Sequence, residues 1–169
     1  MRVSHERTAP VTLESAVDRL KAFIAGRRSS KEPCGDMECF ERELHDYVVA
    51  VEREGLAEEL ARLDVDLPAV TMEGEVSRQV VRCEETYTSA AGPVRVMRSL
   101  YRRLGEGQRT LCPLELRAGI VEGRWTPLAA RQAAFVVAHL TPQEGEDLFR
   151  ELGNMTPSKS SLALTYPHG

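Results

Sequence analysis

The sequence VSRQVVRCEETYTSAAGPVRVMRSLYRR occupies residues 76–103 and decides the fold class, because its two halves are typical of paired strands. Residues 76–89 and 93–103 are rich in Val, Thr, Tyr and Arg, of which the first three favour extended backbone. The residues between them, Ala90-Ala91-Gly92-Pro93, predict a turn, and Ala69–Met72 could add a third strand. Apolar alternation is imperfect, so the register of this predicted antiparallel hairpin stays open.

Helical spacing dominates residues 1–63, upstream of a predicted linker at Asp64–Pro68. Thr12 is placed to cap a first helix, and a second helix should start near Asp36. Gly55 costs about 1 kcal/mol relative to Ala inside a helix, so a kink or break there is one alternative. We expect a helical hairpin whose acidic side chains form a solvated face.

The dipeptide Thr-Pro occurs three times near the C-terminus, beginning at Thr126, Thr141 and Thr156, with a constant period of fifteen residues. Threonine caps helices, and proline is tolerated at the first helical position, so the pattern predicts three short helices. Glu144 follows Thr141 by three positions and completes a capping box. Such helices resemble a helix-turn-helix, and the alternative is a bundle of capped helices that binds no nucleic acid.

The predicted fold is therefore α+β, with four successive segments. They are a helical hairpin region at 1–63, a β-rich and arginine-rich segment at 64–124, short Thr-Pro-capped helices at 125–162 and an unrelated tail at 163–169.

Charge is distributed unevenly along the 169 residues, whose formal net charge is −4. Residues 1–75 carry 10 basic and 17 acidic side chains, whereas residues 76–131 carry 10 basic and 5 acidic ones, and all ten are arginines. Arginine matches phosphate oxygens and guanine edges well, although solvated arginines on the outer face of a sheet would give the same composition. The candidate DNA-binding residues are Arg95, Arg98, Arg102, Arg103, Ser158, Lys159 and Ser160.

No catalytic or metal-binding set is predicted. Cys34 and Cys39 form a C-x4-C pair, but Cys83 and Cys112 stand alone, so the second ligand pair that structural zinc favours is missing. There is no glycine-rich phosphate loop, and the clustered carboxylates are expected to be solvated, so neither a cofactor nor an enzymatic activity is predicted. No apolar run approaches the ~18 residues of a membrane span, and the N-terminus lacks a signal-peptide core, so we expect a cytoplasmic protein without a membrane partner.

Residues 85–101, ETYTSAAGPVRVMRSLY, contain a Thr followed by G-x-V-x-V-x-R-x-x-Y. With the segments 113–119, 125–130, 140–144 and 155–162, they resemble the Kra group of DDE-type transposases of bacterial insertion sequences, over roughly residues 60–162. In that family a DNA-binding N-terminal part precedes an RNase H-like domain, whose two Asp and one Glu bind two divalent metals.

The resemblance implies the DNA-binding N-terminal portion of a transposase, truncated before the catalytic domain, because no carboxylate of this chain matches the triad. The expected partners are double-stranded DNA at the element ends and either a second copy or full-length transposase, with nucleoid association when DNA is bound. One alternative is a protein-interaction or dimerisation module that inhibits transposition without binding DNA. Another is a decayed product with no selected role.

Overall fold

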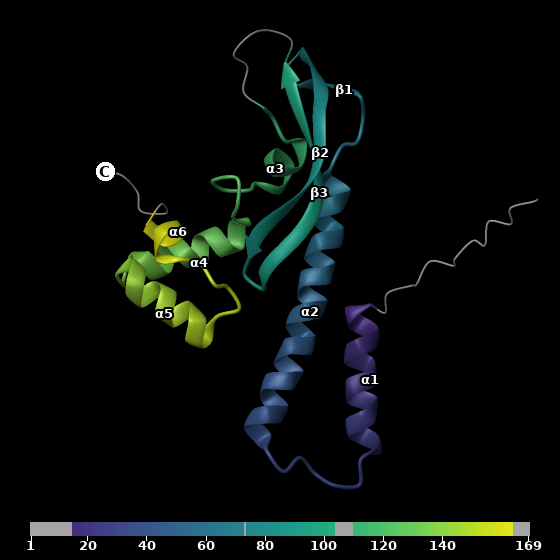
Figure 1. The fold of residues 1–169 in the computed structure, drawn as a ribbon, viewed down its shortest axis with the longest axis vertical. Coiled ribbons are helices and arrows are strands. Elements are labelled where there is room, and N and C mark those ends of the chain that lie inside the picture. The colour runs from purple at the N-terminus through teal and green to yellow at the C-terminus, as the bar shows by residue number, and fades with distance from the viewer. Residues whose placement is uncertain (1–14, 73, 104–109, 164–169) are drawn as a thin grey trace, which may run out of the picture. The chain divides into compact units, whose positions relative to one another are not determined.

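The computed structural model describes residues 15–72, 74–103 and 110–163 (Figure 1). It confirms the α+β class, with helices and one three-stranded antiparallel sheet. The chain divides into two compact units between Val51 and Glu52, within one continuous helix. Each unit is described by itself. Within the described ranges, no helix combines the length and the apolar composition needed to cross a bilayer.

The first unit is a helical hairpin formed by α1 (Ala16–Ser29) and the first part of α2 (Met37–Leu63) (Figure 1). The predicted cap Thr12 lies outside the described residues, and it is the Ser15 hydroxyl that accepts the N–H of Asp18 at 3.2 Å. The Phe23 ring stacks on Tyr47, with centroids 4.7 Å apart, and on Phe40. The helical hairpin is thus held mainly by aromatic contacts.

Helix α2 begins where its sequence predicts, because the Asp36 carboxylate accepts the N–H of Cys39 at 3.1 Å. It continues without a break through Gly55, so a break there is the wrong alternative. Its last turns belong to the second unit, where Leu56, Ala57 and Leu60 pack against the sheet. Tertiary packing of this apolar stripe outweighs the low helix propensity of a single glycine.

The sheet has the order β1-β2-β3, formed by β1 (Ala69–Met72), β2 (Glu75–Ser89) and β3 (Gly92–Arg103). These elements confirm the predicted strands, turn and third strand. Tyr87 pairs with Val94. An irregularity in β2 between Gln79 and Val81 shifts the register for the pairs that follow, such as Gln79 with Tyr101. The imperfect alternation in β3 has another cause: Val94 and Val96 are buried on one face, while Ser99 and Tyr101 on the other face are covered by residues 64–67.

The face of the sheet with Val94 and Val96 carries one of the two hydrophobic clusters that are buried among the described residues of the second unit. Tyr87, Val94 and Val96 pack there with Leu60 of α2 and with Leu114 of α3 (Pro113–Ala118). By its sequence, the segment 111–116 predicts a short strand or a turn. Only Leu111 pairs with the sheet, and the helix follows because proline starts it and Gly119 ends it at φ +65°.

The predicted linker after α2 is a strap that begins at the outer edge of β3 and crosses the face of the sheet to β2, where Asp66 accepts a hydrogen bond from Gln79 at 2.9 Å. Asp64 accepts the backbone N–H of Ser99 at 2.8 Å and its hydroxyl at 3.1 Å. The Tyr101 hydroxyl accepts the N–H of Leu67 at 3.1 Å. The strap therefore satisfies polar groups of β3 that the edge of a sheet would leave unpaired.

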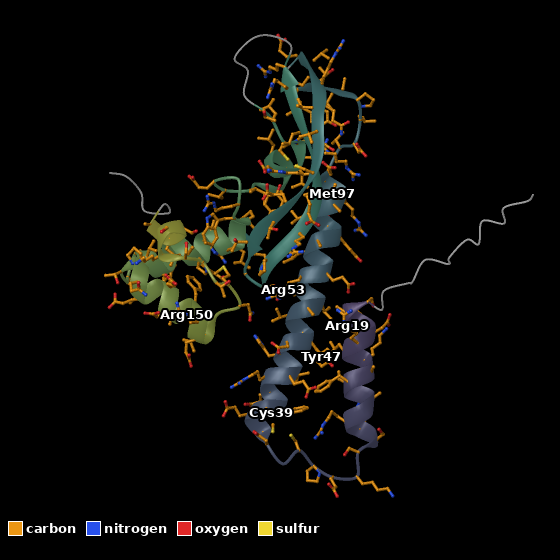
Figure 2. The ribbon with its side chains drawn as sticks, viewed as in Figure 1. Arg19, Cys39, Tyr47, Arg53, Met97 and Arg150 are labelled. Atoms are coloured by element: carbon orange, nitrogen blue, oxygen red, sulfur yellow. The ribbon has the colours of Figure 1, made fainter. Side chains whose placement is uncertain are left out.

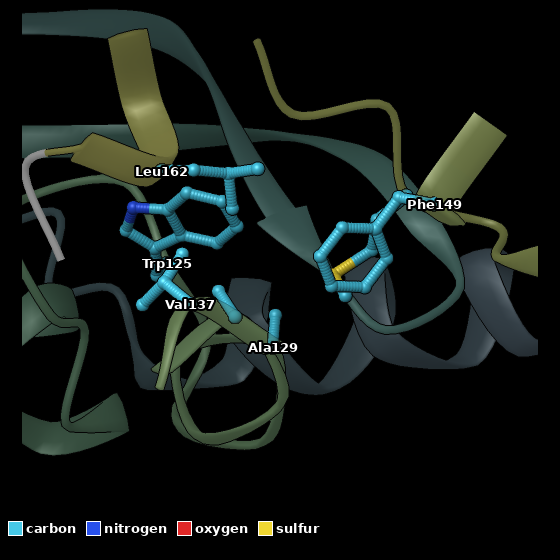
Figure 3. Close-up of a cluster of buried hydrophobic side chains, with 7 residues drawn as sticks. Trp125, Ala129, Val137, Phe149 and Leu162 are labelled. Carbon is cyan, nitrogen blue, oxygen red and sulfur yellow. The ribbon is translucent and has the colours of Figure 1, made fainter. Parts of the chain in front are cut away.

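The C-terminal helices α4 (Pro127–Val137), α5 (Pro142–Leu152) and α6 (Lys159–Ala163) surround the buried Trp125 (Figure 3). The capping box of Thr141 and Glu144 is present as predicted, and α5 ends at Gly153. The third cap is wrong: α6 begins at Lys159, and the hydroxyl of Ser158, not of Thr156, accepts the N–H of Ser161 at 3.3 Å. The helix-turn-helix stays a prediction.

Candidate nucleic-acid interface

Two arginines face each other across the sheet. Arg78 of β2 pairs in register with Arg102 of β3, both are exposed, and Arg103 follows in the chain. Among the described residues, neither the Arg78 nor the Arg102 guanidinium has a hydrogen bond or an ion pair. Like charges directly opposite each other on two strands are destabilising, so this end of the sheet would be stabilised by an anion.

Arg95 lies on the solvent-facing side of the same hairpin, on the face opposite to that of Arg102, because seven positions along one strand separate them. It pairs in register with Thr86, is exposed, and neighbours Met97, which is 42% exposed (Figure 2). Within the described ranges its guanidinium also has no partner. On this face Arg82 differs, because it forms ion pairs with Asp64 and Asp66 at 3.5 and 3.4 Å. Arg95 is therefore available to an external anion, whereas Arg82 is already neutralised.

Arg98 points to the opposite, core-facing side. Its guanidinium donates to Glu115 of α3 and to Glu85 of β2, and the Tyr87 hydroxyl donates to the same Glu115 oxygen at 3.1 Å. The Arg98 side chain is 16% exposed. Burial opposes the charged form, but interactions with Tyr87, Glu115 and Glu85 outweigh it and raise the pKa of Arg98. Arg98 was predicted as a DNA-binding residue, and the structure corrects this, because its guanidinium is committed to internal carboxylates.

The other predicted residues lie at α6, and no hydrogen bond or ion pair between described residues joins them to the sheet arginines. The Ser158 hydroxyl accepts the backbone N–H of Ser161 at the start of the helix, and it also hydrogen-bonds the Ser161 hydroxyl, 3.1 Å away. Lys159 is exposed and its backbone N–H donates to Glu146 at 2.9 Å. Ser160 is exposed. The candidates thus fall into two groups, one on the sheet and one at α6.

Two arginines of this surface were missed by the sequence reasoning. Arg78 is opposite Arg102 only because of the register shift, which no sequence pattern specified. Arg124 lies in a turn that pairs with the end of β2, and its distance in the sequence from α6 hid its contact with Ser161. A search for arginines without nearby carboxylates would have found both, but only with the tertiary structure known.

The cysteines do not form a metal site within the part of the chain that the structure describes, since no group of three or more His, Cys, Asp or Glu is close enough to hold an ion. Cys112 is buried in the core, where burial raises the pKa of its thiol. Cys34 donates its S–H to the Asp36 carbonyl at 2.9 Å, and Cys39 is exposed. These thiols are best explained as structural or solvent-exposed side chains.

Comparison of the chain with protein-family models, curated proteins and solved structures found no match. The geometry of the arginines therefore carries the functional argument.

Proposed function

We propose that this protein binds duplex DNA through the β2–β3 hairpin, as the DNA-binding portion of a transposase whose strand-transfer chemistry resides elsewhere. The observation that carries the proposal is the group of exposed arginines Arg78, Arg95 and Arg102, none with a carboxylate partner among the described residues. The transposase assignment rests on the sequence resemblance alone.

The hairpin has a shape that suits this role. An antiparallel two-stranded ribbon fits the major groove of B-DNA, and arginines on it can reach phosphates or guanine edges. Arg78 and Arg102 lie near the end of the ribbon that carries β1, because Ala69 pairs with Arg78 (Figure 1). Binding a phosphate between them would replace their mutual repulsion with attraction.

Salt dependence gives the first test, measured as fluorescence anisotropy of a labelled DNA duplex. Three phosphate contacts predict a slope of about −3 for log K against log salt, or about a 40-fold loss of affinity between roughly 50 and 200 mM. The double variant Arg78→Ala/Arg102→Ala should reduce this slope to about −1 and weaken binding to every sequence. Wild-type affinity and slope in the double variant would refute the role of the hairpin.

Arg150→Ala provides a matched control for charge. Arg150 is exposed on α5 but is paired with Glu146 and Asp147 at 3.0 and 2.7 Å (Figure 2). Its removal lowers the net charge by one unit without removing an available cation, so the salt slope should stay unchanged. An equal loss of affinity in Arg150→Ala would mean that net charge, not the hairpin, controls binding.

One observation favours self-association as a second function. Among residues 15–51, only Ala16 and Val49 are buried, while Met37 and Val48 are 60% and 47% exposed. A helical pair with so thin a core gains stability by burying apolar surface against another chain. Light scattering should then show a dimer that Val48→Lys dissociates, and a monomer at high concentration would contradict this function.

A further inference from the structure

A polar cleft of about 510 Å³ opens in the second unit between the end of β2, the 121–125 turn and the start of α6. Five hydroxyl side chains and one guanidinium line it, and all can donate hydrogen bonds: Thr86, Thr88, Thr156, Ser158, Ser161 and Arg124. We propose that this cleft is a second phosphate site for the DNA backbone, with Arg124 as its charged ligand. The inference rests on the proposed function and adds a contact far along the sequence from the hairpin arginines.

The cleft is rigid where Arg124 enters it. The Thr88 N–H donates to the Arg124 carbonyl at 2.7 Å, and the Thr126 N–H donates to the Thr88 carbonyl at 3.0 Å. These bonds fix the turn to the edge of β2. The position of the Arg124 backbone is therefore set before any ligand binds, which lowers the entropic cost of binding.

The turn itself holds an unfavourable backbone conformation. Glu122 has φ +53°, the only positive φ of a non-glycine residue among those described, and Gly123 follows at φ +64°. A left-handed residue with a side chain costs about 1–2 kcal/mol. Such strain persists only where the surrounding structure enforces it, and it concentrates at binding sites. Here it lies two residues before Arg124, in the turn that lines the cleft.

The Arg124 guanidinium is available to an anion. Its recorded contact is a long hydrogen bond of 3.4 Å to the Ser161 hydroxyl, and it has no ion pair within the described ranges. Glu85 also lines the cleft, but one oxygen of its carboxylate is bound by Arg98 and the other accepts the Thr86 N–H at 3.1 Å. The Glu85 carboxylate is therefore neutralised internally. Glu122 also lines the cleft and is its one carboxylate without an ion pair among the described residues, so it opposes the attraction of an anion by Arg124.

The hydroxyls complete a set of donors that matches phosphate. Ser158 and Ser161 lie 3.1 Å apart, oxygen to oxygen, and both face the cleft. Hydroxyl groups and arginine forks are the usual protein donors to phosphate oxygens, and a planar guanidinium binds two such oxygens at once. This assignment gives the predicted residue Ser158 a role that its position at the start of α6 alone would not establish.

The first arm of the test uses inorganic phosphate on the full chain, followed by ¹H–¹⁵N NMR. Saturable shifts of the Thr88, Arg124 and Ser161 amides should occur together and vanish in Arg124→Ala. Glu122→Gln removes a carboxylate from the rim and should tighten phosphate binding, which a general loss of structure would not do. Absence of shifts at these amides in the wild-type chain would overturn the cleft as an anion site.

The second arm measures duplex DNA binding and separates this inference from the proposed function. Arg124→Ala should weaken binding and reduce the salt slope by about 1, while Arg124→Lys should retain part of the affinity. If wild type binds DNA and Arg124→Ala keeps its affinity and slope, the cleft is refuted and the hairpin proposal stands. If wild type binds phosphate but no DNA, the proposed function fails and free phosphate replaces DNA as the ligand, which also overturns the inference.

Discussion

Arg98→Ala should destabilise the second unit without weakening DNA binding. Arg95→Ala should weaken DNA binding and leave the stability of the unit nearly unchanged. The Arg98 guanidinium holds Glu85 and Glu115 together, and these three side chains are only 16%, 34% and 22% exposed. Removing one partner of a buried ion pair costs about 3–5 kcal/mol, because the remaining charges lose their compensation. Partial exposure places this network near the lower limit, at about 3 kcal/mol.

The assay is unfolding in urea, which is uncharged and does not screen the ion pairs. Trp125 is the single tryptophan of the chain and is 1% exposed, so its fluorescence reports unfolding of this unit. Arg95→Ala is the matched control, since it removes an unpartnered arginine from the same strand and should change stability by less than about 0.5 kcal/mol. A double-mutant cycle with Glu115→Ala should give a coupling energy of about 1–2 kcal/mol.

The result that would refute this reasoning is specific. If Arg98→Ala unfolds at the same urea concentration as Arg95→Ala but binds DNA less tightly, then Arg98 is a DNA ligand and its carboxylate contacts are incidental. Measuring anisotropy and urea unfolding on the same protein samples removes the ambiguity of a variant that is merely partly unfolded.

Three further changes test the remaining structure. Gly92→Ala should lower the free energy of unfolding in urea by about 2 kcal/mol. Gly92 has φ +103°, and a Cβ there would lie 2.5 Å from the Arg53 guanidinium. Glu122→Gly should raise the free energy of unfolding by about 0.5 kcal/mol. Glycine removes the penalty of the left-handed backbone, and this gain exceeds the cost of the greater entropy that glycine gives the unfolded chain. The backbone N–H and hydroxyl of Thr141 lower the pKa of Glu144. The contribution of Glu144 to folding stability is therefore present above its unfolded pKa of about 4.3 and is lost as pH falls through its folded pKa. Glu144→Gln should therefore lower the urea midpoint at pH 7, and the difference from wild type should disappear in acid.

Local signals predicted most of the fold. The strands, their turn and the capping box of α5 depend on residues a few positions apart, such as Thr141 and Glu144, so the sequence contains them directly. The strap could not be predicted in this way, because Asp64 finds its partner Ser99 across 35 positions. The third cap failed since Ser158 competes with Thr156 for the same role, and local sequence does not decide between two such caps.

The candidate site shows where local reasoning stops, and why. Arg98 follows Val94 and Val96 at intervals of two, so strand parity alone places it on the core-facing side, whereas Arg95 falls on the other. Arg98 is partly buried against the core, so its charge needs carboxylate partners, and it finds them in Glu85 and Glu115. Arg102 has the same parity but is exposed, so it needs none. The imperfect alternation concealed this, because Ser99 and Tyr101 are buried on the opposite side of β3, where residues 64–67 cover them. Arg78, Arg95 and Arg102 have no carboxylate partner among the described residues, and this depends on which residues the strand pairing places beside them, so it is a property of the pairing and not of any one strand.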